Sequence, residues 1–402
     1  MYALLNHWRV LEAAAFVAAP LAGMTLAQLG CEVIRLDPPG GGPDANRWPV
    51  DGNGRSLYWA GLNKGKKSVV LDTRHPEGRE LAQALATAPG PQAGLLLTNQ
   101  PMRDWLDTAA LTRRRADLIV AQVKGNADGS PAVDYTINCA VGFPLATGPQ
   151  GLAGPVNHVL PAWDAITGMT CALGLVVAAQ QRALDGQGRV LSVALSDVAI
   201  AMAGNLGHIA EAEINGESRA RHGNDLFGAY GTDMAAADGR RLMVVALTPR
   251  QWRALGEATG LAEKFAALGA LLGLDLDREG DRFQARDAIS LLLRPWCAAR
   301  TFQDITHAFD AAGVCWGPYQ TFAEMVAHDK RCSAANPMLQ YVKQPGIGEY
   351  LTPGSPIAFD GVAREPVAPA PSLGQHTDEV LAAVLGLPDH VISRLHDTGV
   401  AA

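Results

Sequence analysis

The chain has 402 residues, of which 48% are hydrophobic and 18% are charged, and its formal net charge is −7. This length allows roughly two or three domains, the composition excludes wholesale disorder, and the lack of a cationic surplus argues against nucleic acid as the main partner. The six cysteines are scattered without a CxxC pair, so we expect neither a zinc site nor a disulfide framework, and a reduced, cytoplasmic protein.

The first apolar run, LEAAAFVAAPLAGMTLAQLG, covers residues 11–30 and has some features of a targeting signal. Glu12 and Pro20 interrupt the run, and a strand-like segment follows it at once. We therefore predict a helix over residues 20–30 rather than a signal peptide or a membrane span.

The next hundred residues alternate strand and helix patterns. A helix is predicted over residues 75–88, and strands over residues 31–37, 67–73, 93–99 and 116–125. Strands that are separated by helices favour parallel pairing with right-handed crossovers. Ligands collect at the carboxyl ends of such strands, which here are residues 35–37, Asn99 and residues 124–125.

Further along, a long helix is predicted over residues 162–184, and then a strand that continues into an apolar helix over residues 190–210. The composition becomes more polar after residue 216. The segments AYGTDMAA and RLMVVAL flank a turn typical of a hairpin, and amphipathic helices follow them. We read residues 224–326 as a smaller α+β domain.

A single carboxylate, Asp164, lies within GPVNHVLPAWDAITGM, where the long helix is expected to begin. The amino terminus of a helix keeps a carboxylate charged, and neighbouring apolar residues limit its hydration. A charged, oriented and poorly hydrated carboxylate is a competent nucleophile. The alternative interpretation is that Asp164 only caps the helix.

Six segments in order carry a family resemblance: RVLEAAAFVAAPLAGMTLAQLGCEVIRLDPPGGG, NKGKKSVVLDTRHPEGREL, GPVNHVLPAWDAITGM, ALDGQGRVLSVALSDVAIA, DAAGVCWGPYQTFAEMVAHD and PSLGQHTDEVL. They resemble the family III CoA-transferases, of CaiB/BaiF type, over about residues 9–387. The resemblance implies an α/β protein with a Rossmann-like large domain from residues 1–215 and 327–402, a small α+β domain over 224–326, and an interlocked homodimer.

The same resemblance implies that Asp164 is the nucleophile and forms a mixed anhydride with the acyl group of a CoA thioester. Coenzyme A is then part of the small-molecule substrate, and we expect no prosthetic group, metal, nucleic acid or membrane partner. The positions that match the family's CoA-binding region are Phe16, Val17, Ala18, Arg35, Leu62, Lys66, Lys67, Asn99, Arg103 and Lys124. The cations among them suit phosphate groups, although each lysine can also be an ordinary solvated charge.

Within the family, the region from GNADGSPAVDYTINCAVGFPLATGP to PVNHVLPAWD is most similar to a branch that acts within one molecule. This similarity implies transfer of CoA from the C1 to the C4 carboxyl group of 2-methylfumarate (mesaconate). The free carboxylate of such a substrate needs a cation, for which the candidates are Arg221, His222 and Arg103. Other polar candidates are Tyr135, Asn138, Asn157 and His158.

Three alternatives remain open. The first is an intermolecular transferase that moves CoA from a short acyl-CoA, such as succinyl-CoA, to another carboxylate. Departures from the formyl-CoA transferase pattern at Val17, Pro38 and residues 99–105 argue against a small-acid acceptor. The second is an α-methylacyl-CoA racemase, whose family pattern has a histidine where Trp163 stands. The third is a nucleotide-binding module that uses PGGGPDANR, which lacks the GxGxxG spacing.

Overall fold

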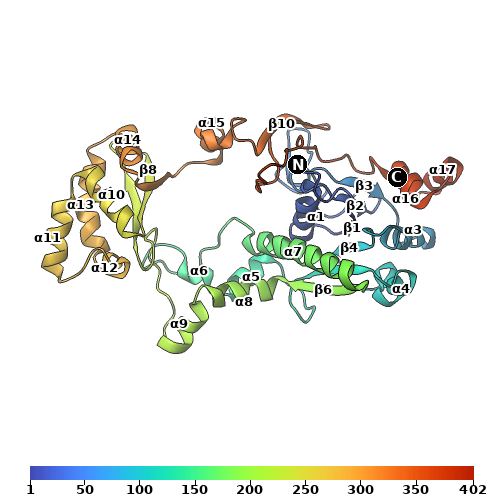
Figure 1. Ribbon diagram of the computed structural model, residues 1–402, viewed down its shortest axis with the longest axis horizontal. Coiled ribbons are helices and arrows are strands. Elements are labelled where there is room, and N and C mark those ends of the chain that lie inside the picture. Colours follow the sequence, from blue (N-terminus) through green and yellow to red (C-terminus); the bar gives the residue numbers. More distant parts are fainter. The chain divides into compact units, whose positions relative to one another are not determined.

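The computed structural model describes residues 1–402, and their contacts divide the chain into two compact units. The large unit consists of residues 1–141, 159–208 and 330–402, and the small unit of residues 142–158 and 209–329 (Figure 1). Both ends of the chain therefore belong to the large unit.

The segment 142–158 is the main difference from the domain bounds expected from the sequence, which placed it in the large domain. In the structure the Arg221 guanidinium donates hydrogen bonds to the carbonyls of Leu145, Leu152 and Pro144, at 2.7, 2.7 and 3.3 Å. These bonds attach the segment to the small unit. Nothing in the local sequence pattern indicates such a long-range attachment.

A six-stranded parallel sheet forms the centre of the large unit, in the order β3-β2-β1-β4-β5-β6. Its strands are short and largely buried, as is usual when helices cover both faces of a parallel sheet. They are β1 (Arg9–Ala13), β2 (Glu32–Asp37), β3 (Lys67–Val70), β4 (Leu95–Thr98), β5 (Ile119–Lys124) and β6 (Arg189–Ala194). The chain order reverses between β1 and β4, and such switch points are where ligands bind in open α/β sheets.

Strand β1 was not predicted, because residues 9–30 form one apolar stretch in which strand and helix have no visible boundary. The other five strands agree with the sequence patterns, as do the helices expected over residues 75–88 and 162–184. The predicted helix over residues 20–30 is α1 (Ala18–Gln28), which begins two residues earlier and holds Pro20 in its first turn. A proline is tolerated there, because the first N–H groups of a helix have no partner within it.

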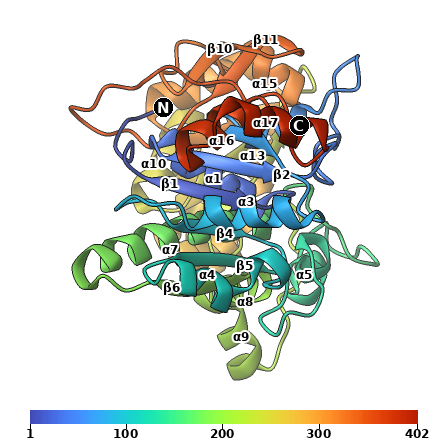
Figure 2. The same cartoon turned by 90° about the vertical axis from the view of Figure 1, so that its right-hand side faces the viewer.

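Helices cover the two faces of the sheet (Figures 1 and 2). Helices α1 and α7 (Ala162–Asp185) pack on one face. Against the other face, Leu11, Leu96 and Val120 pack in a core shared with four helices. These are α3 (Pro76–Ala86), α4 (Thr108–Arg114), α16 (Thr377–Leu385) and α17 (Asp389–Asp397).

The remaining elements of the large unit are short. They are α2 (Leu57–Leu62), α5 (Asp134–Ala140), α8 (Leu195–Asn205), the hairpin of β10 (Leu339–Gln344) and β11 (Gly348–Pro353), and the 3₁₀ turns η1 (Asp104–Leu106) and η2 (Lys330–Cys332). The hairpin of β10 and β11 was not predicted.

Helix α7 contacts α1 closely through Gly168. A Cβ atom at this position would lie 2.6 Å from the carbonyl oxygen of Ala18, so only glycine allows the observed approach of the two helices. Length and composition alone would also let α7 cross a membrane, a test that core helices of soluble proteins pass as well. Here α7 packs against α1, β5 and β6.

The small unit contains a three-stranded antiparallel sheet in the order β7-β8-β9, with the predicted hairpin as its first two strands. The strands are β7 (Tyr230–Ala235), β8 (Arg241–Ala246) and β9 (Cys315–Pro318). Its apolar core also includes residues of four helices, α10 (Pro249–Thr259), α11 (Ala262–Leu272), α13 (Arg286–Ala298) and α14 (Phe302–Ala312). The shorter helices are α6 (Phe143–Ala146), α12 (Glu279–Gln284) and α15 (Phe322–His328), and α9 (His208–Asn215) begins at the boundary of the units.

Candidate active site

The amino terminus of α7 is capped by a residue from another helix. Pro161 occupies the N-cap position and has no side-chain acceptor. Instead, one carboxylate oxygen of Asp134, at the start of α5, accepts hydrogen bonds from the backbone N–H groups of Trp163 and Asp164, at 2.7 and 3.1 Å. Asp134 is almost completely buried, and its other oxygen has no hydrogen-bond partner. Two of the free N–H groups of α7 are thereby satisfied without the Asp164 side chain.

This arrangement separates the two interpretations of Asp164. If the side chain of Asp164 only capped the helix, it would accept the hydrogen bonds that Asp134 accepts. The carboxylate of Asp164 lies instead in the first turn of α7, partly buried, beside the positive end of the helix dipole. It is therefore available to react with a bound molecule.

The surroundings of Asp164 raise its pKa to about 6 from the usual 3.8. The main cause is burial, which disfavours the charged form, and the second is the negative charge of Asp134. The positive charge of Arg47 acts in the opposite direction. A carboxylate with this pKa is mostly ionised at pH 7 yet poorly hydrated, and both properties favour nucleophilic attack.

The loop between β1 and α1 lies at the switch point of the sheet and is fixed from two sides. The side-chain amide of Asn99, directly after β4, donates to the carbonyl of Ala15 at 2.8 Å and accepts from its N–H at 3.2 Å. The N–H of Phe16 donates to the Asp44 carboxylate at 3.0 Å, and Phe16 has a φ of 70°, in the left-handed region. The ring of Phe16 remains exposed.

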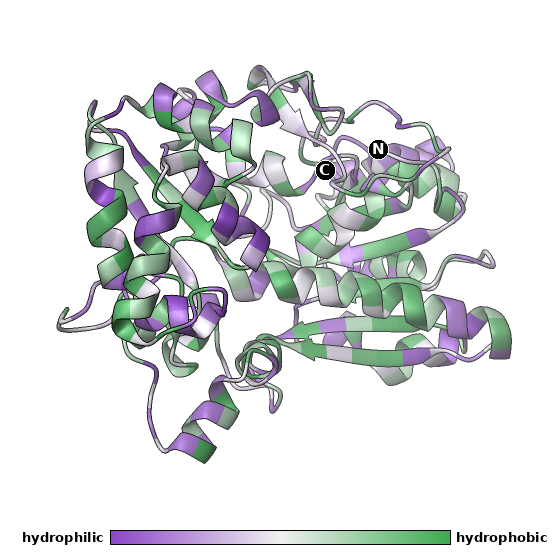
Figure 3. Cartoon of the chain, turned by 60° about the vertical axis from the view of Figure 1, so that its left-hand side comes forward, coloured by the Kyte–Doolittle hydropathy of each residue, from purple (hydrophilic) through white to green (hydrophobic).

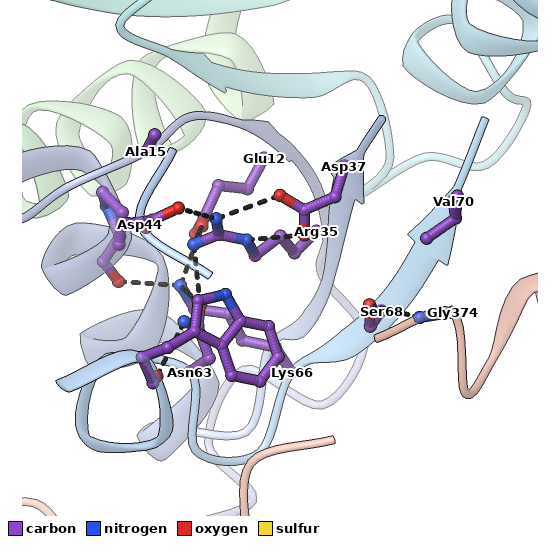
Figure 4. Close-up of polar contacts among 12 residues, drawn as sticks. Glu12, Ala15, Arg35, Asp37, Asp44, Asn63, Lys66, Ser68, Val70 and Gly374 are labelled. Carbon is purple, nitrogen blue, oxygen red and sulfur yellow. Dashed lines mark hydrogen bonds and ion pairs between the residues drawn. The ribbon is translucent and has the colours of Figure 1, made fainter. Parts of the chain in front are cut away.

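A buried charge network lies beneath this loop (Figure 4). Arg35 is completely buried and donates to Asp37, at 2.9 and 3.0 Å, and to Asp44, at 2.8 Å. Lys66 is also buried and donates to Glu12, at 2.8 Å, and to Asn63, at 2.9 Å. Burial lowers the pKa of Lys66 to about 8 and raises that of Glu12.

These contacts correct the expectation that Arg35 and Lys66 bind the phosphates of CoA. Both charges face buried carboxylates and are withdrawn from solvent, because a buried cation needs an anionic partner. The network instead fixes Asp44, and through it the backbone of Phe16. The sequence feature that indicates this buried network is Glu12, an acidic residue between the apolar residues of strand β1.

The other positions expected to bind CoA do not all lie at one edge of the sheet. Val17 and Ala18 begin α1 and are buried, and Leu62 ends α2. Lys67, at the start of β3, pairs with Glu32 and Glu379 at 2.7 and 2.8 Å. Arg103 is largely exposed beside Asp104, and Lys124 ends β5. Of the five Arg and Lys residues expected to bind CoA, only Arg103 is mainly exposed.

Two of the residues expected to bind the acyl group lie close to α7. Asn138 is buried and accepts a hydrogen bond from the indole N–H of Trp163 at 3.2 Å. The Tyr135 hydroxyl donates to the carbonyl of Val159 at 3.4 Å. Both residues therefore help to form the surroundings of Asp164, as does Asp134, which the sequence analysis did not single out.

The four remaining candidates belong to the small unit. Arg221 donates to backbone carbonyls, as described above, and His222 packs against the rings of Phe227 and Phe283. Asn157 and His158 lie at the end of the segment 142–158. The guanidinium of Arg221 is thus occupied by structural hydrogen bonds.

The chain was compared with proteins of known family or structure. A family model described as CoA-transferase family III matches residues 5–377. The chain is 55% identical over 403 residues to the 2-methylfumaryl-CoA isomerase of Chloroflexus aurantiacus. The aligned region covers 100% of this chain and 98% of that protein. It is 28% identical to the succinyl-CoA–D-citramalate CoA-transferase of the same organism, over 97% of this chain and 96% of that protein.

The fold is similar to that of solved structures. A CaiB/BaiF family protein from Brucella suis superposes with a TM-score of 0.76 at 23% sequence identity, over 96% of this chain and 100% of that one. Fold, family model and full-length similarity agree, and the chain belongs to CoA-transferase family III.

Proposed function

We propose that this protein transfers CoA within one molecule, from the C1 to the C4 carboxyl group of 2-methylfumarate, with Asp164 as the covalent nucleophile. The substrate is supported by the full-length similarity to an isomerase of this name. The nucleophile is supported by one observation above all: Asp134 caps α7, so the buried carboxylate of Asp164 is not used by the helix itself.

The proposed reaction proceeds through acyl transfers that need no net proton movement. The Asp164 carboxylate attacks the C1 thioester carbonyl, an oxygen–carbon bond forms, the carbon–sulfur bond breaks, and CoA leaves as a thiolate. The thiolate then attacks the aspartyl carbonyl of the mixed anhydride, which gives an aspartyl thioester and free 2-methylfumarate. The C4 carboxylate of this acid attacks the aspartyl thioester and again releases the thiolate. Attack of the thiolate on the C4 carbonyl gives the product and regenerates Asp164.

The test uses purified protein and 2-methylfumaryl-1-CoA without any other acid, followed by NMR. We expect the signals of the 4-thioester to appear with matching loss of the 1-thioester. Asp164→Asn should abolish this conversion, since an amide cannot form the anhydride, and hydroxylamine should trap an acyl-enzyme only in the wild type. A wild-type protein that leaves the 1-thioester unchanged contradicts the proposal, as does an Asp164→Asn variant with a near-normal rate.

An intermolecular transferase is the second candidate, because one relative carries succinyl-CoA in its name. The same experiment separates the two functions. The intermolecular enzyme would produce a new thioester only after a second carboxylic acid is added. Racemisation is less well supported, since Trp163 is buried at the position where racemases have histidine.

We further infer that the protein is a cytoplasmic homodimer. Cys31, Cys171, Cys297, Cys315 and Cys332 are free thiols, which supports a reducing compartment. An exposed apolar stripe on the largely apolar helix α7 supports a partner subunit (Figure 3). Its residues Met169, Leu173 and Val177 recur every four positions and are 45–64% exposed.

A further inference from the structure

The cation for the free carboxylate of the substrate is the unresolved part of the proposed site. Of the three cations expected from the sequence, Arg221 is bonded to backbone carbonyls and His222 packs among aromatic rings. Arg103 is 77% exposed, and its nearest acid, Asp104, lies 3.9 Å away. We therefore searched the large unit for a cation that is close to Asp164 and has no partner.

Arg47 meets both conditions. Its guanidinium carbon lies 5.2 Å from the ring centroid of Tyr58 and 5.5 Å from that of Phe16, distances at which an aromatic ring attracts a cation. No carboxylate of the chain forms an ion pair with it. The guanidinium is thus held by two ring faces, which leaves its N–H donors available to a ligand.

The backbone of Arg47 is fixed as well. Its N–H donates to the carbonyl of Asp44 at 3.2 Å, and its carbonyl accepts from the hydroxyl of Ser56, the N-cap of α2, at 2.5 Å. Asp44 is in turn held by the buried Arg35. The loop that carries Arg47 is therefore attached to the charge network under the sheet edge, which fixes the backbone of Arg47, while its exposed side chain lies against the two rings.

Arg47 also acts on the nucleophile. Its positive charge is close enough to lower the pKa of the Asp164 carboxyl, against the effect of burial. It has the same effect on Tyr58, whose hydroxyl is buried and has no hydrogen-bond partner. The charge of Asp164 in turn reaches Tyr58. A cation with open donors and an unpaired hydroxyl thus lie in the neighbourhood of the reacting carboxylate.

We propose that Arg47, together with the Tyr58 hydroxyl, binds the free carboxylate of the dicarboxylic acyl group while the other carboxyl group is bonded to Asp164. This proposal rests on the proposed function, which supplies the second carboxylate. A planar guanidinium donates two parallel hydrogen bonds to a carboxylate, and a phenol adds a third donor. The pair would select dicarboxylic over monocarboxylic acyl groups and retain the free acid between the two transfers.

The test measures binding without turnover, in the Asp164→Asn background, by calorimetry. The ligands are 2-methylfumaryl-1-CoA and 2-methylbut-2-enoyl-CoA, in which a methyl group replaces the free carboxylate. We expect Arg47→Met to weaken binding of the first ligand about 100-fold and of the second by less than about threefold, because only the first offers a charge partner. Arg47→Lys should retain part of the preference, and Tyr58→Phe should lose a smaller part of it.

Arg113→Met is the matched control, since it removes an exposed arginine of the large unit, on α4, that is not a binding candidate, and it should change neither affinity. Equal weakening of both ligands by Arg47→Met would overturn the proposal, because Arg47 would then bind CoA itself. Unchanged binding of both would overturn it too. Failure of the proposed function is distinguishable: the wild type would not isomerise the thioester, whatever the effect of Arg47 on binding.

Discussion

At the scale of single residues, the site depends on how two carboxylates share the beginning of α7. Asp134 accepts the hydrogen bonds of the helix, and the partly buried carboxylate of Asp164 is left for the proposed reaction, although both acids lie at the start of a helix. The cost of this proximity is the raised pKa of Asp164, since a second negative charge nearby disfavours its ionisation. Burial has the larger effect on this pKa.

The pH dependence of the rate follows from this pair. In the proposed reaction only ionised Asp164 attacks, so kcat/KM should fall about tenfold per pH unit below a pKa of about 6. Asp134→Asn keeps an acceptor oxygen for the helix but removes the like charge, so its acid limb should move to lower pH. Arg47→Met removes an opposite charge, so its limb should move to higher pH.

Initial rates measured from pH 4.5 to 8 with all three proteins check these shifts, and Arg113→Met on α4 is the control. An acid limb of Asp134→Asn that stays in place or moves upward would show that Asp134 does not set the acidity of the nucleophile.

At the residue scale, the sequence can single out a position that a family pattern marks, but it does not reveal which side chains are buried or what they contact across the fold. Asp164 could be singled out because a whole motif surrounds it. Asp134 could not, because an acid at the start of its own helix looks like a local cap, and only the fold shows that it caps another helix. Likewise, no local pattern tells that Arg35 points inward to Asp37 and Asp44.

At the scale of elements, the position of Asp164 depends on the contact between α7 and α1. The two helices approach through Gly168, which lies about one turn after Asp164. A small residue at this contact sets how near the catalytic end of α7 lies to the loop that begins α1.

We therefore expect Gly168→Val to push α7 away from α1, because its Cβ would lie 2.6 Å from a backbone oxygen that cannot rotate aside. Overpacking of this kind lowers the free energy of unfolding by about 1–3 kcal/mol. The rate should fall as well, because Asp164 moves with the helix.

Gly174→Ala is the matched control on the same helix. There the added Cβ would meet only the tip of the Leu191 side chain, at 2.7 Å, and this tip can move. Urea unfolding and isomerisation rates of both variants test the idea. Equal stability of Gly168→Val and Gly174→Ala would contradict it.

Strands β2 to β6 could be predicted, because strand-like and helical sequence patterns alternate along this part of the chain. The start of α7 coincides with its prediction, since Pro161 ends the preceding loop. Strand β1 was missed because no polar residue separates it from the loop and helix that follow. The hairpin of β10 and β11 was missed because its strands contain Lys, Gln and Glu residues and only part of each is buried.

At the scale of the whole molecule, the exposed stripe on α7 bears on assembly. Leu173 and Val177 are 64% and 59% exposed, and a soluble chain seldom leaves such a row uncovered. The proposed homodimer would cover it, and light scattering after size-exclusion chromatography should give twice the 42.3 kDa of one chain.

The double variant Leu173→Glu, Val177→Glu should shift this mass toward one chain, since buried unpaired charges are unfavourable. Leu271→Glu is the control, because it places the same charge at an exposed leucine of the small unit. A wild-type protein with the mass of a single chain would contradict the dimer.

The external cap on α7 has a consequence for how this protein can diverge. The strength of its nucleophile is adjusted by a side chain on a different helix, thirty positions earlier in the chain, which has no part in bonding to the acyl group. Exchange of that one acid for asparagine, which keeps an acceptor oxygen for α7 but removes the charge, would change the acidity of Asp164 while the helix cap stayed in place. The acidity of Asp164 can therefore be changed without changing the fold, and Asp134 is the position at which directed evolution could begin.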